Sequence, residues 1–156
     1  MKIVKVETVR STIQGYCWIL VYTDTGLVGT GETHHGAHGA EVFIHEYARS
    51  MLLGSNPEDI ELLWNQMYKR ASLFGFMGAE LRAISAIDMA LWDLMGKALD
   101  RPLYRLLGGQ TREQVSIYYS GIYDSVDMVK DEVQDWSKQC VDAGWTACKT
   151  ARFFGD

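Results

Sequence analysis

Three histidines within a five-residue span are the first side chains in this sequence that could do chemistry. His34, His35 and His38 lie in the run from Gly31 to Gly39, whose density of glycine predicts a loop. Imidazoles spaced this closely could bind Zn²⁺. No cysteine or pair of carboxylates nearby completes a ligand set, and one loop rarely supplies every ligand. A metal site and a solvated polar loop are therefore both open interpretations of this segment.

Two carboxylates, Asp88 and Asp93, lie five residues apart in a segment with helical periodicity. Positions five apart on an α-helix do not share a face, so we do not expect this pair to act as an acid and a base. An ion pair or a charge-assisted hydrogen bond to Arg82 or Lys97 fits the sequence better. We expect a structural role for both carboxylates.

The composition narrows the class of protein. Apolar residues make up 47% of the chain and charged residues 22%, which is typical of a globular fold. The net charge of -5 argues against a nucleic-acid partner, which would require clustered Lys and Arg. No segment has the roughly 20 apolar residues that span a bilayer, and the start of the chain lacks the apolar stretch of a signal peptide. We expect a cytoplasmic protein that binds neither membrane nor nucleic acid.

The three cysteines, Cys17, Cys140 and Cys148, are an odd and scattered set that does not predict a disulfide framework. Cys17 and Cys148 lie in runs typical of strands, so we expect both to be buried, reduced thiols.

Strands and then helices are expected in the first two thirds of the chain. Alternating residues predict strands over 3–11 and 16–23 and the start of a third at 27–30, with a turn at 24–26, which together form an antiparallel meander. Helices are predicted over 40–53 and 79–99. Between these two helices, Asn56 as a cap and Pro57 at the first helical position predict a third helix start, followed by an apolar stripe at Ile60, Leu63, Trp64 and Met67.

The last third of the chain has a different pattern. A strand over 114–120, a helix that begins at Ser125 or Asp127 and runs through Val141, and a strand over 146–150 predict a βαβ unit with parallel strands. Parallel sheets are normally covered by helices on both faces, and two strands cannot form such a structure alone. We therefore expect an architecture that is truncated at the end of this sequence.

Several segments together resemble one enzyme family. The run AISAIDMALWDLMGK at 83–97, followed by RPLYRLLGG at 101–109, resembles a signature of the mandelate racemase and muconate lactonizing branch of the enolase superfamily. The hairpin YTDTGLVGTGE at 22–32 is similar to the second-to-third-strand turn of that family, and GWTACKT at 144–150 is similar to its second barrel strand.

The resemblance implies an N-terminal α+β capping domain over residues 1–110 and the first elements of a modified TIM-type barrel over residues 113–156. Members of the family bind Mg²⁺ through carboxylates on later barrel strands, which this sequence lacks, so no residue here is assigned as a metal ligand. The metal stabilises the enediolate that forms when a base removes a proton α to a carboxylate.

The resemblance thus implies a small-molecule carboxylate or sugar-acid substrate and, by analogy, a homo-oligomer. Dehydration of an acid sugar is the leading expectation. Racemisation, epimerisation, cycloisomerisation and a non-catalytic fragment are the alternatives.

The resemblance also singles out one catalytic candidate. Many members carry Lys-x-Lys at the end of the second barrel strand, and Lys149 matches the first of these lysines, which lies near the substrate carboxylate. Ala151 stands at the position of the second lysine, which acts as acid or base in those members. A base from a later strand, such as a His-Asp pair, would then have to replace it.

Two cap loops are the remaining candidates for substrate contact. Ile13, Gln14 and Tyr16 lie in the connection between the first two strands, which in this family reaches toward the mouth of the barrel. His34 and His35 match the position of the mobile cap loop that covers the substrate. The alternative for both segments is a plain turn or a polar loop.

Overall fold

The structure is a computed structural model that describes residues 1–12, 15–34, 37–73, 75, 77–120 and 130–149. The chain divides into two compact units, Met1–Gln110 and Thr111–Asp156, and each has its own sheet. Among the described residues, no helix is long and apolar enough to cross a lipid bilayer.

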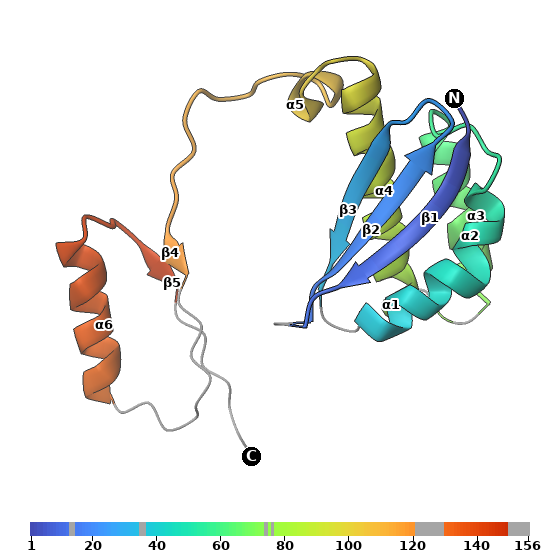
Figure 1. Cartoon of the computed structure of the whole chain (residues 1–156). Coiled ribbons are helices and arrows are strands. Elements are labelled where there is room, and N and C mark those ends of the chain that lie inside the picture. Colours follow the sequence, from blue (N-terminus) through green and yellow to red (C-terminus); the bar gives the residue numbers. More distant parts are fainter. Residues whose placement is uncertain (13–14, 35–36, 74, 76, 121–129, 150–156) are drawn as a thin grey trace. The chain divides into compact units, whose positions relative to one another are not determined.

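The first unit is built on a three-stranded antiparallel sheet in the order β1-β2-β3, which confirms the predicted meander (Figure 1). Its strands are β1 (Ile3–Arg10), β2 (Cys17–Thr23) and β3 (Val28–Thr33). Along β2 every second residue is buried, as the period of two predicts. In β1 the buried residues Ile3 and Val6 are three apart, because the register shifts between Ile3 and Lys5. Such a bulge adds one residue and keeps both side chains on the core face.

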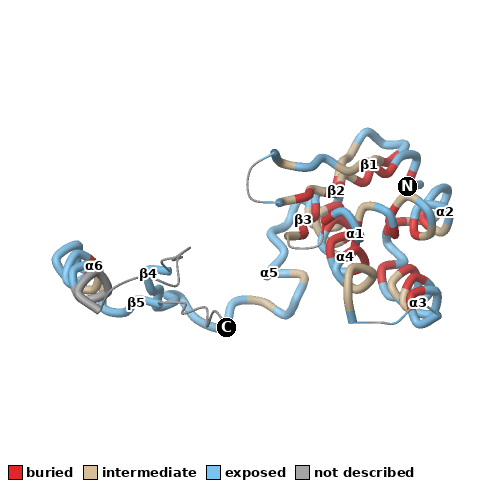
Figure 2. The backbone as a smooth tube through the Cα atoms, turned by 90° about the horizontal axis from the view of Figure 1, so that it is seen from below, coloured by how far each residue is buried: buried red, intermediate tan, exposed pale blue. Residues whose placement is uncertain are grey.

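Helix α4 (Ala79–Ala98) covers the inner face of this sheet, with the bounds predicted to within one residue (Figure 1). Its buried residues recur at helical spacing. Figure 2 shows the buried positions of the first unit concentrated where the helices and the sheet lie next to each other. The helix ends in a Schellman motif, in which the amide of Arg101 donates to the carbonyl of Gly96 at 2.9 Å. Asp100 occupies the left-handed position of that motif, at φ +50°, where glycine is usual.

Two glycines allow α4 to lie unusually close to β3. A Cβ atom on Gly29 would overlap the carbonyl oxygen of Ala90, and one on Gly31 would overlap the carbonyl oxygen of Ala86. Both obstructing atoms belong to the backbone of a buried helix, so neither can turn aside. The third strand can therefore carry only glycine at these two positions.

The segment after β3 is helical earlier than predicted. Helix α1 begins at Ala37, not at Ala40, and continues through the π-helical turn η1 to the end of α2, two residues before Gly54. The elements are α1 (Ala37–Phe43), η1 (Ile44–Ala48) and α2 (Arg49–Leu52). The predicted loop from Gly31 to Gly39 is therefore wrong at both ends. A Cβ on Gly39 would lie 2.7 Å from the Cβ of Ala79, so this glycine marks a contact between helices and not a break.

The predicted start of the next helix is also wrong. Helix α3 (Ile60–Ala71) begins three residues after Pro57. The side chain of Asn56 accepts a hydrogen bond from the amide of Glu58 at 3.3 Å, so it closes a turn ahead of the helix and does not cap it. The predicted apolar stripe is confirmed, since Leu63 and Met67 are buried. A short helix, α5 (Leu103–Leu106), follows α4.

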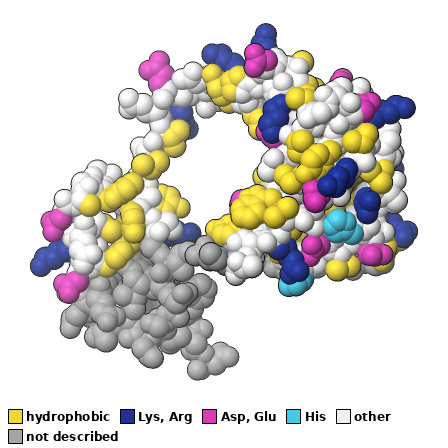
Figure 3. Space-filling view, viewed as in Figure 1, with side chains coloured by type: hydrophobic (Ala, Val, Ile, Leu, Met, Phe, Trp, Pro, Cys, Tyr) yellow, Lys and Arg dark blue, Asp and Glu magenta, His cyan; other side chains and the backbone are white. Residues whose placement is uncertain are grey.

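The outer face of the sheet carries a mixture of aromatic, aliphatic and charged side chains (Figure 3). Lys5 and Glu7 form an ion pair there at 2.9 Å, and the hydroxyl of Tyr22 donates to the same carboxylate at 2.8 Å. The pKa of Glu7 is lowered, first by its bond to Lys5 and then by its bond to Tyr22.

The second unit contains a βαβ element, and its two strands are parallel, as predicted. Its elements are β4 (Tyr119–Ser120), α6 (Lys130–Asp142) and β5 (Cys148–Lys149). Over the described residues both strands are shorter than predicted, because the ladder there pairs Tyr119 with Cys148 and Ser120 with Lys149 alone. The predicted start of the helix lies outside the described residues. Cys148 is exposed, contrary to the prediction, whereas Cys17 is buried as predicted.

Candidate functional site

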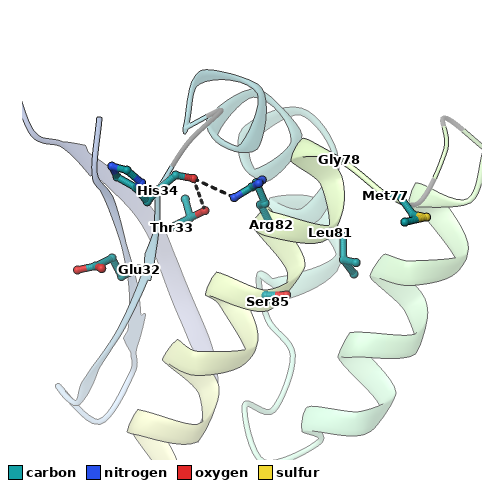
Figure 4. A pocket seen from close by; sticks show the side chains of 8 residues that line it. All are labelled: Glu32, Thr33, His34, Met77, Gly78, Leu81, Arg82 and Ser85. Atoms are coloured by element: carbon teal, nitrogen blue, oxygen red, sulfur yellow. Dashed lines mark hydrogen bonds between the residues drawn. The ribbon is translucent and has the colours of Figure 1, made fainter. Parts of the chain in front are cut away.

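An open pocket of about 530 Å³ lies beside the third strand, near the start of α4 (Figure 4). It combines an apolar wall with polar groups, and Met77 at its rim is 88% exposed. Its lining residues are Glu32, Thr33, His34, Met77, Gly78, Leu81, Arg82 and Ser85.

The pocket lies along the open edge of the sheet, because β3 is an edge strand. Side chains of α4 already satisfy part of that edge. Lys97 Nζ donates to the carbonyl of Val28 at 2.7 Å, and the amide of Thr30 donates to Asp93 Oδ2 at 2.8 Å. Alternate residues of a strand direct their backbone groups to the same side. The amide and carbonyl of Glu32 therefore face this edge too, at the level of the pocket.

Asp93 also forms an ion pair with Lys97 at 2.6 Å, which confirms one of the two partners predicted for the helical carboxylates. Asp88 has a different environment. Its pKa is raised, first by burial and then by the nearby charge of Glu61. Neither arrangement places the two carboxylates in one site.

Arg82 joins the start of α4 to the end of β3. Its Nη1 donates to the backbone carbonyl of His34 at 3.4 Å, and the hydroxyl of Thr33 donates to the same oxygen at 3.4 Å (Figure 4). Within the described part of the chain, no carboxylate lies at ion-pair distance from Arg82. Its guanidinium therefore has unused donors at the pocket.

The side chains of Glu32 and His34 point away from α4, on the other side of the strand from Arg82 and Ser85 (Figure 4). There the ring of His34 lies 4.4 Å from the ring of Tyr16, and Trp18 Nε1 donates to Glu32 Oε2 at 2.9 Å. These contacts tie the first strand connection to the end of β3. Aromatic faces next to hydroxyl-binding groups suit the C–H and O–H surfaces of a polyhydroxylated ligand.

The structure brings together two of the predicted contact residues, Tyr16 and His34. Ile13, Gln14 and His35 lie outside the described residues. Lys149 is the last residue of β5, in the second unit, where it is exposed and paired in register with Ser120.

His38 belongs to a polar network between β1 and α1, and not to the pocket. Arg10 donates to the ring of His38 at 2.7 Å and forms an ion pair with Glu41 at 2.9 Å. The hydroxyl of Thr8 donates to Glu41 at 2.8 Å and lies 2.8 Å from Nε2 of His45. The described residues, which do not include His35, hold no group of three His, Cys, Asp or Glu side chains that could bind a metal ion.

Sequence reasoning missed Arg82 and Ser85 as pocket residues. Arg82 was expected to pair with a helical carboxylate, but that partner is Lys97. The available signal was their spacing, because polar residues three apart share a helix face. Nothing local indicates which element lies opposite that face.

Comparisons with known proteins place the first unit in a family. The family described as "Mandelate racemase / muconate lactonizing enzyme, N-terminal domain" matches residues 3–108. A D-galactonate dehydratase of Verminephrobacter eiseniae is 36% identical over 152 residues, which cover 96% of this chain and 38% of the relative.

Solved structures agree. A mandelate racemase/muconate lactonizing protein from Paracoccus denitrificans, complexed with magnesium, matches with a TM-score of 0.84 and 30% identity over 99% of this chain and 43% of its own. The 3,6-anhydro-D-galactonate cycloisomerase from Zobellia galactanivorans matches with a TM-score of 0.84 and 30% identity over 96% and 42% of the respective chains.

The chain spans between 25% and 39% of the length of the curated relatives it matches. Its first unit has the three antiparallel strands and the covering helices of the family's N-terminal capping domain. This chain therefore belongs to the mandelate racemase and muconate lactonizing enzyme family of the enolase superfamily.

Proposed function

We propose that this chain supplies the capping domain and the first barrel elements of a Mg²⁺-dependent enzyme that removes a proton α to a carboxylate and dehydrates an acid sugar. The observation that carries the proposal is the family match over residues 3–108, together with a dehydratase relative that aligns with 96% of the chain. In this proposal the protein is a cytoplasmic homo-oligomer, a point that rests on the sequence and on family analogy.

Lys149 is the catalytic candidate in this chain. It ends a parallel strand, and barrel enzymes place their catalytic groups at the carboxyl ends of such strands. Its proposed role is to hold the substrate carboxylate and to stabilise the negative charge that develops when the α-proton leaves. The described residues offer no ligand set for Mg²⁺, so the metal ligands in this proposal come from sequence that follows Asp156.

The cap residues have a binding role. The pair formed by Tyr16 and His34 links two segments that we propose to contact substrate. Ile13, Gln14 and His35 belong to the same two segments and are proposed to share that role, so the cap would select the hydroxylated end of the substrate.

The test is a turnover assay on the complete coding sequence that contains this chain. Purified protein is incubated with Mg²⁺ and a panel of aldonates and aldarates, and the 2-keto-3-deoxy acid expected from dehydration is trapped with semicarbazide. Lys149→Ala should lower kcat by at least about 100-fold with little change in Tm. Lys138→Ala is the matched control, since Lys138 is an exposed lysine of the same unit. Absence of keto acid from every sugar acid would overturn the proposal.

A cycloisomerase is the second candidate activity. The 3,6-anhydro-D-galactonate cycloisomerase matches this chain with the same TM-score as the magnesium-bound protein from Paracoccus denitrificans, 0.84. Solvent deuterium at the α-carbon of the recovered sugar acid, with no trapped keto acid, would identify racemisation or epimerisation. A keto acid formed only from a lactone or anhydro sugar acid, by opening of the ring without loss of water, would identify a cycloisomerase. Unchanged turnover in Lys149→Ala would remove that residue from the site under either chemistry.

A further inference from the structure

We propose that Cys140 and Cys148 form a reversible disulfide when the protein meets hydrogen peroxide. In this reaction the exposed Cys148 thiol reacts first with the peroxide, and the buried Cys140 thiol then closes the bond. The site lies within the second unit, and the inference does not rest on the function proposed above.

The register of the second sheet directs Cys148 toward α6. Tyr119 of β4 and Cys148 of β5 are partners in the parallel ladder, so their side chains point to the same face of the sheet. That face is the one next to α6, because the ring of Tyr119 lies 5.5 Å from the ring of Trp136 on that helix. Figure 1 shows α6 beside the two strands. The Cys148 thiol therefore faces the helix.

Cys140 lies on the face of α6 that meets these strands. It follows Trp136 by four residues, which is about one turn of helix, so the two side chains share a face. The end of the helix is also joined to the segment that returns to β5, since the amide of Trp145 donates to the carbonyl of Cys140 at 3.0 Å. The two cysteines meet across this interface, where a hydrogen bond joins their thiols.

The different environments of the two thiols assign their roles. Cys140 is only 6% exposed, whereas Cys148 is open to solvent. The pKa of Cys140 is raised, first by burial and then by the charge of Cys148 and the hydrogen bond to it. A thiol with a raised pKa is a poor first nucleophile, because the thiolate is the reactive form. Peroxide therefore meets Cys148 first, and Cys140 lies beside it as the resolving thiol.

The reaction needs only a peroxide and balances without a cofactor. The Cys148 thiolate attacks one oxygen of hydrogen peroxide, the O–O bond breaks, and hydroxide leaves, so the sulfur becomes a sulfenic acid. The Cys140 sulfur then attacks the Cys148 sulfur. The S–S bond forms, the S–O bond breaks, and the Cys140 proton leaves with the hydroxyl group as water. Two molecules of a small thiol such as glutathione reverse the bond and become a disulfide themselves.

A metal site fits these thiols less well. Two sulfur ligands fill only part of the tetrahedral shell of zinc, and the described residues supply no group of three His, Cys, Asp or Glu side chains. Disulfides in a reducing compartment are usually transient and redox-sensing, so a reversible bond agrees with the cytoplasmic location proposed above. The bond would fix to α6 the strand whose last residue is Lys149.

The test is peroxide treatment of protein purified from the complete coding sequence that contains this chain. After treatment the protein is unfolded in urea, labelled with iodoacetamide and digested with trypsin. Cleavage after Lys138 and Lys149 leaves both cysteines in one peptide, residues 139–149. We expect a label on each cysteine before oxidation. After oxidation we expect no label and a mass about 2 Da below that of the unlabelled dithiol peptide, and dithiothreitol should restore both labels.

Variants assign the order of the two steps. Cys140→Ser should abolish the disulfide and leave a sulfenic acid at Cys148 that dimedone traps. Cys148→Ser should give neither the disulfide nor a dimedone adduct at Cys140. Cys17→Ala is the control, because Cys17 is a fully buried thiol of the first unit, and it should not change the fraction of oxidised peptide.

Three results in the wild-type protein would each overturn the proposal. The first is a label on both cysteines after treatment with excess peroxide. The second is a disulfide that joins Cys148 to any other cysteine or to a second molecule. The third is a sulfinic acid at Cys148 beside a free Cys140 thiol. These measurements need no variant, so they decide the matter even if a substituted protein does not fold.

Discussion

Gly31→Ala is the sharpest test of how this capping domain is packed. Replacing glycine in a strand by alanine ordinarily stabilises a protein, by about 0.4–1 kcal/mol, because the unfolded chain loses freedom. Here the new methyl group would overlap the carbonyl oxygen of Ala86 and lie 3.1 Å from the amide nitrogen of Ala90. Both atoms are in the backbone of the buried helix α4, so relief requires that the helix move as a body.

The expected loss follows from that geometry. Overpacking a core costs about 1–3 kcal/mol when side chains can rearrange. Because the obstructing atoms belong to the backbone and cannot rotate away, we expect a cost at the upper end of this range. The free energy of unfolding should therefore fall by about 3 kcal/mol. For a unit of this size that corresponds to a decrease in Tm of about 10–20 °C. The sign is opposite to the ordinary effect of this substitution, which makes the measurement decisive.

Urea unfolding followed by circular dichroism gives the free energy, and amide hydrogen exchange in α4 shows whether the helix is the element that loosens. Thr30→Ala is the control on the same strand, because it removes atoms at an exposed position and should change stability by less than about 1 kcal/mol. An Ala86→Gly substitution should not rescue Gly31→Ala, since the obstructing atom is a carbonyl oxygen. A Gly31→Ala protein as stable as wild type would refute the close packing of β3 on α4.

Three further substitutions probe the same helix. Asp93→Ala should lower the free energy of unfolding by about 1 kcal/mol in a urea titration, because Thr30 and Lys97 lose their common acceptor, while Asp93→Asn should lose less. Asp88→Asn should stabilise the protein increasingly as the pH rises above the ordinary pKa of aspartate, because the raised pKa of Asp88 means that its ionisation opposes folding. A difference in the free energy of unfolding between the variant and wild type that does not change with pH would contradict the burial of Asp88. Asp100→Gly should raise Tm, by the equivalent of about 0.5–1 kcal/mol, because φ is +50° there; no gain would show that aspartate has no strain at this position.

The parts of the fold that sequence predicted well are those decided by local periodicity. The meander, the turn at Gly26 and the bounds of α4 each follow from a pattern within a few residues. The βαβ order of the second unit was predicted for the same reason. The lengths of the two strands in this unit were not predicted correctly, because a strand extends only where a partner strand lies beside it.

The errors at the end of β3 and at the start of α1 share one physical cause, which is that a glycine can either break regular structure or make room for a neighbouring element within it. Local rules treat it as a break, and that holds at Gly26 and Gly54, where φ is positive. At Gly31 and Gly39 the missing side chain makes room for α4, so regular structure continues through both. No local signal separates these cases, because the second depends on an element about 50 residues away in the sequence.

Those contacts also explain why the pocket lies where it does. Gly29 is opposite Ala90 and Gly31 is opposite Ala86, so two residues of strand, roughly 6.7 Å, match four residues of helix, roughly 6 Å. One more step pairs Thr33 with Arg82. Threonine has a side chain and arginine is long, so the close contact cannot continue, and a gap opens that Arg82 spans to reach the end of β3. The pocket therefore forms where the alternating glycines of β3 end, at Thr33. It depends on the same close packing of β3 on α4 that Gly31→Ala would disrupt.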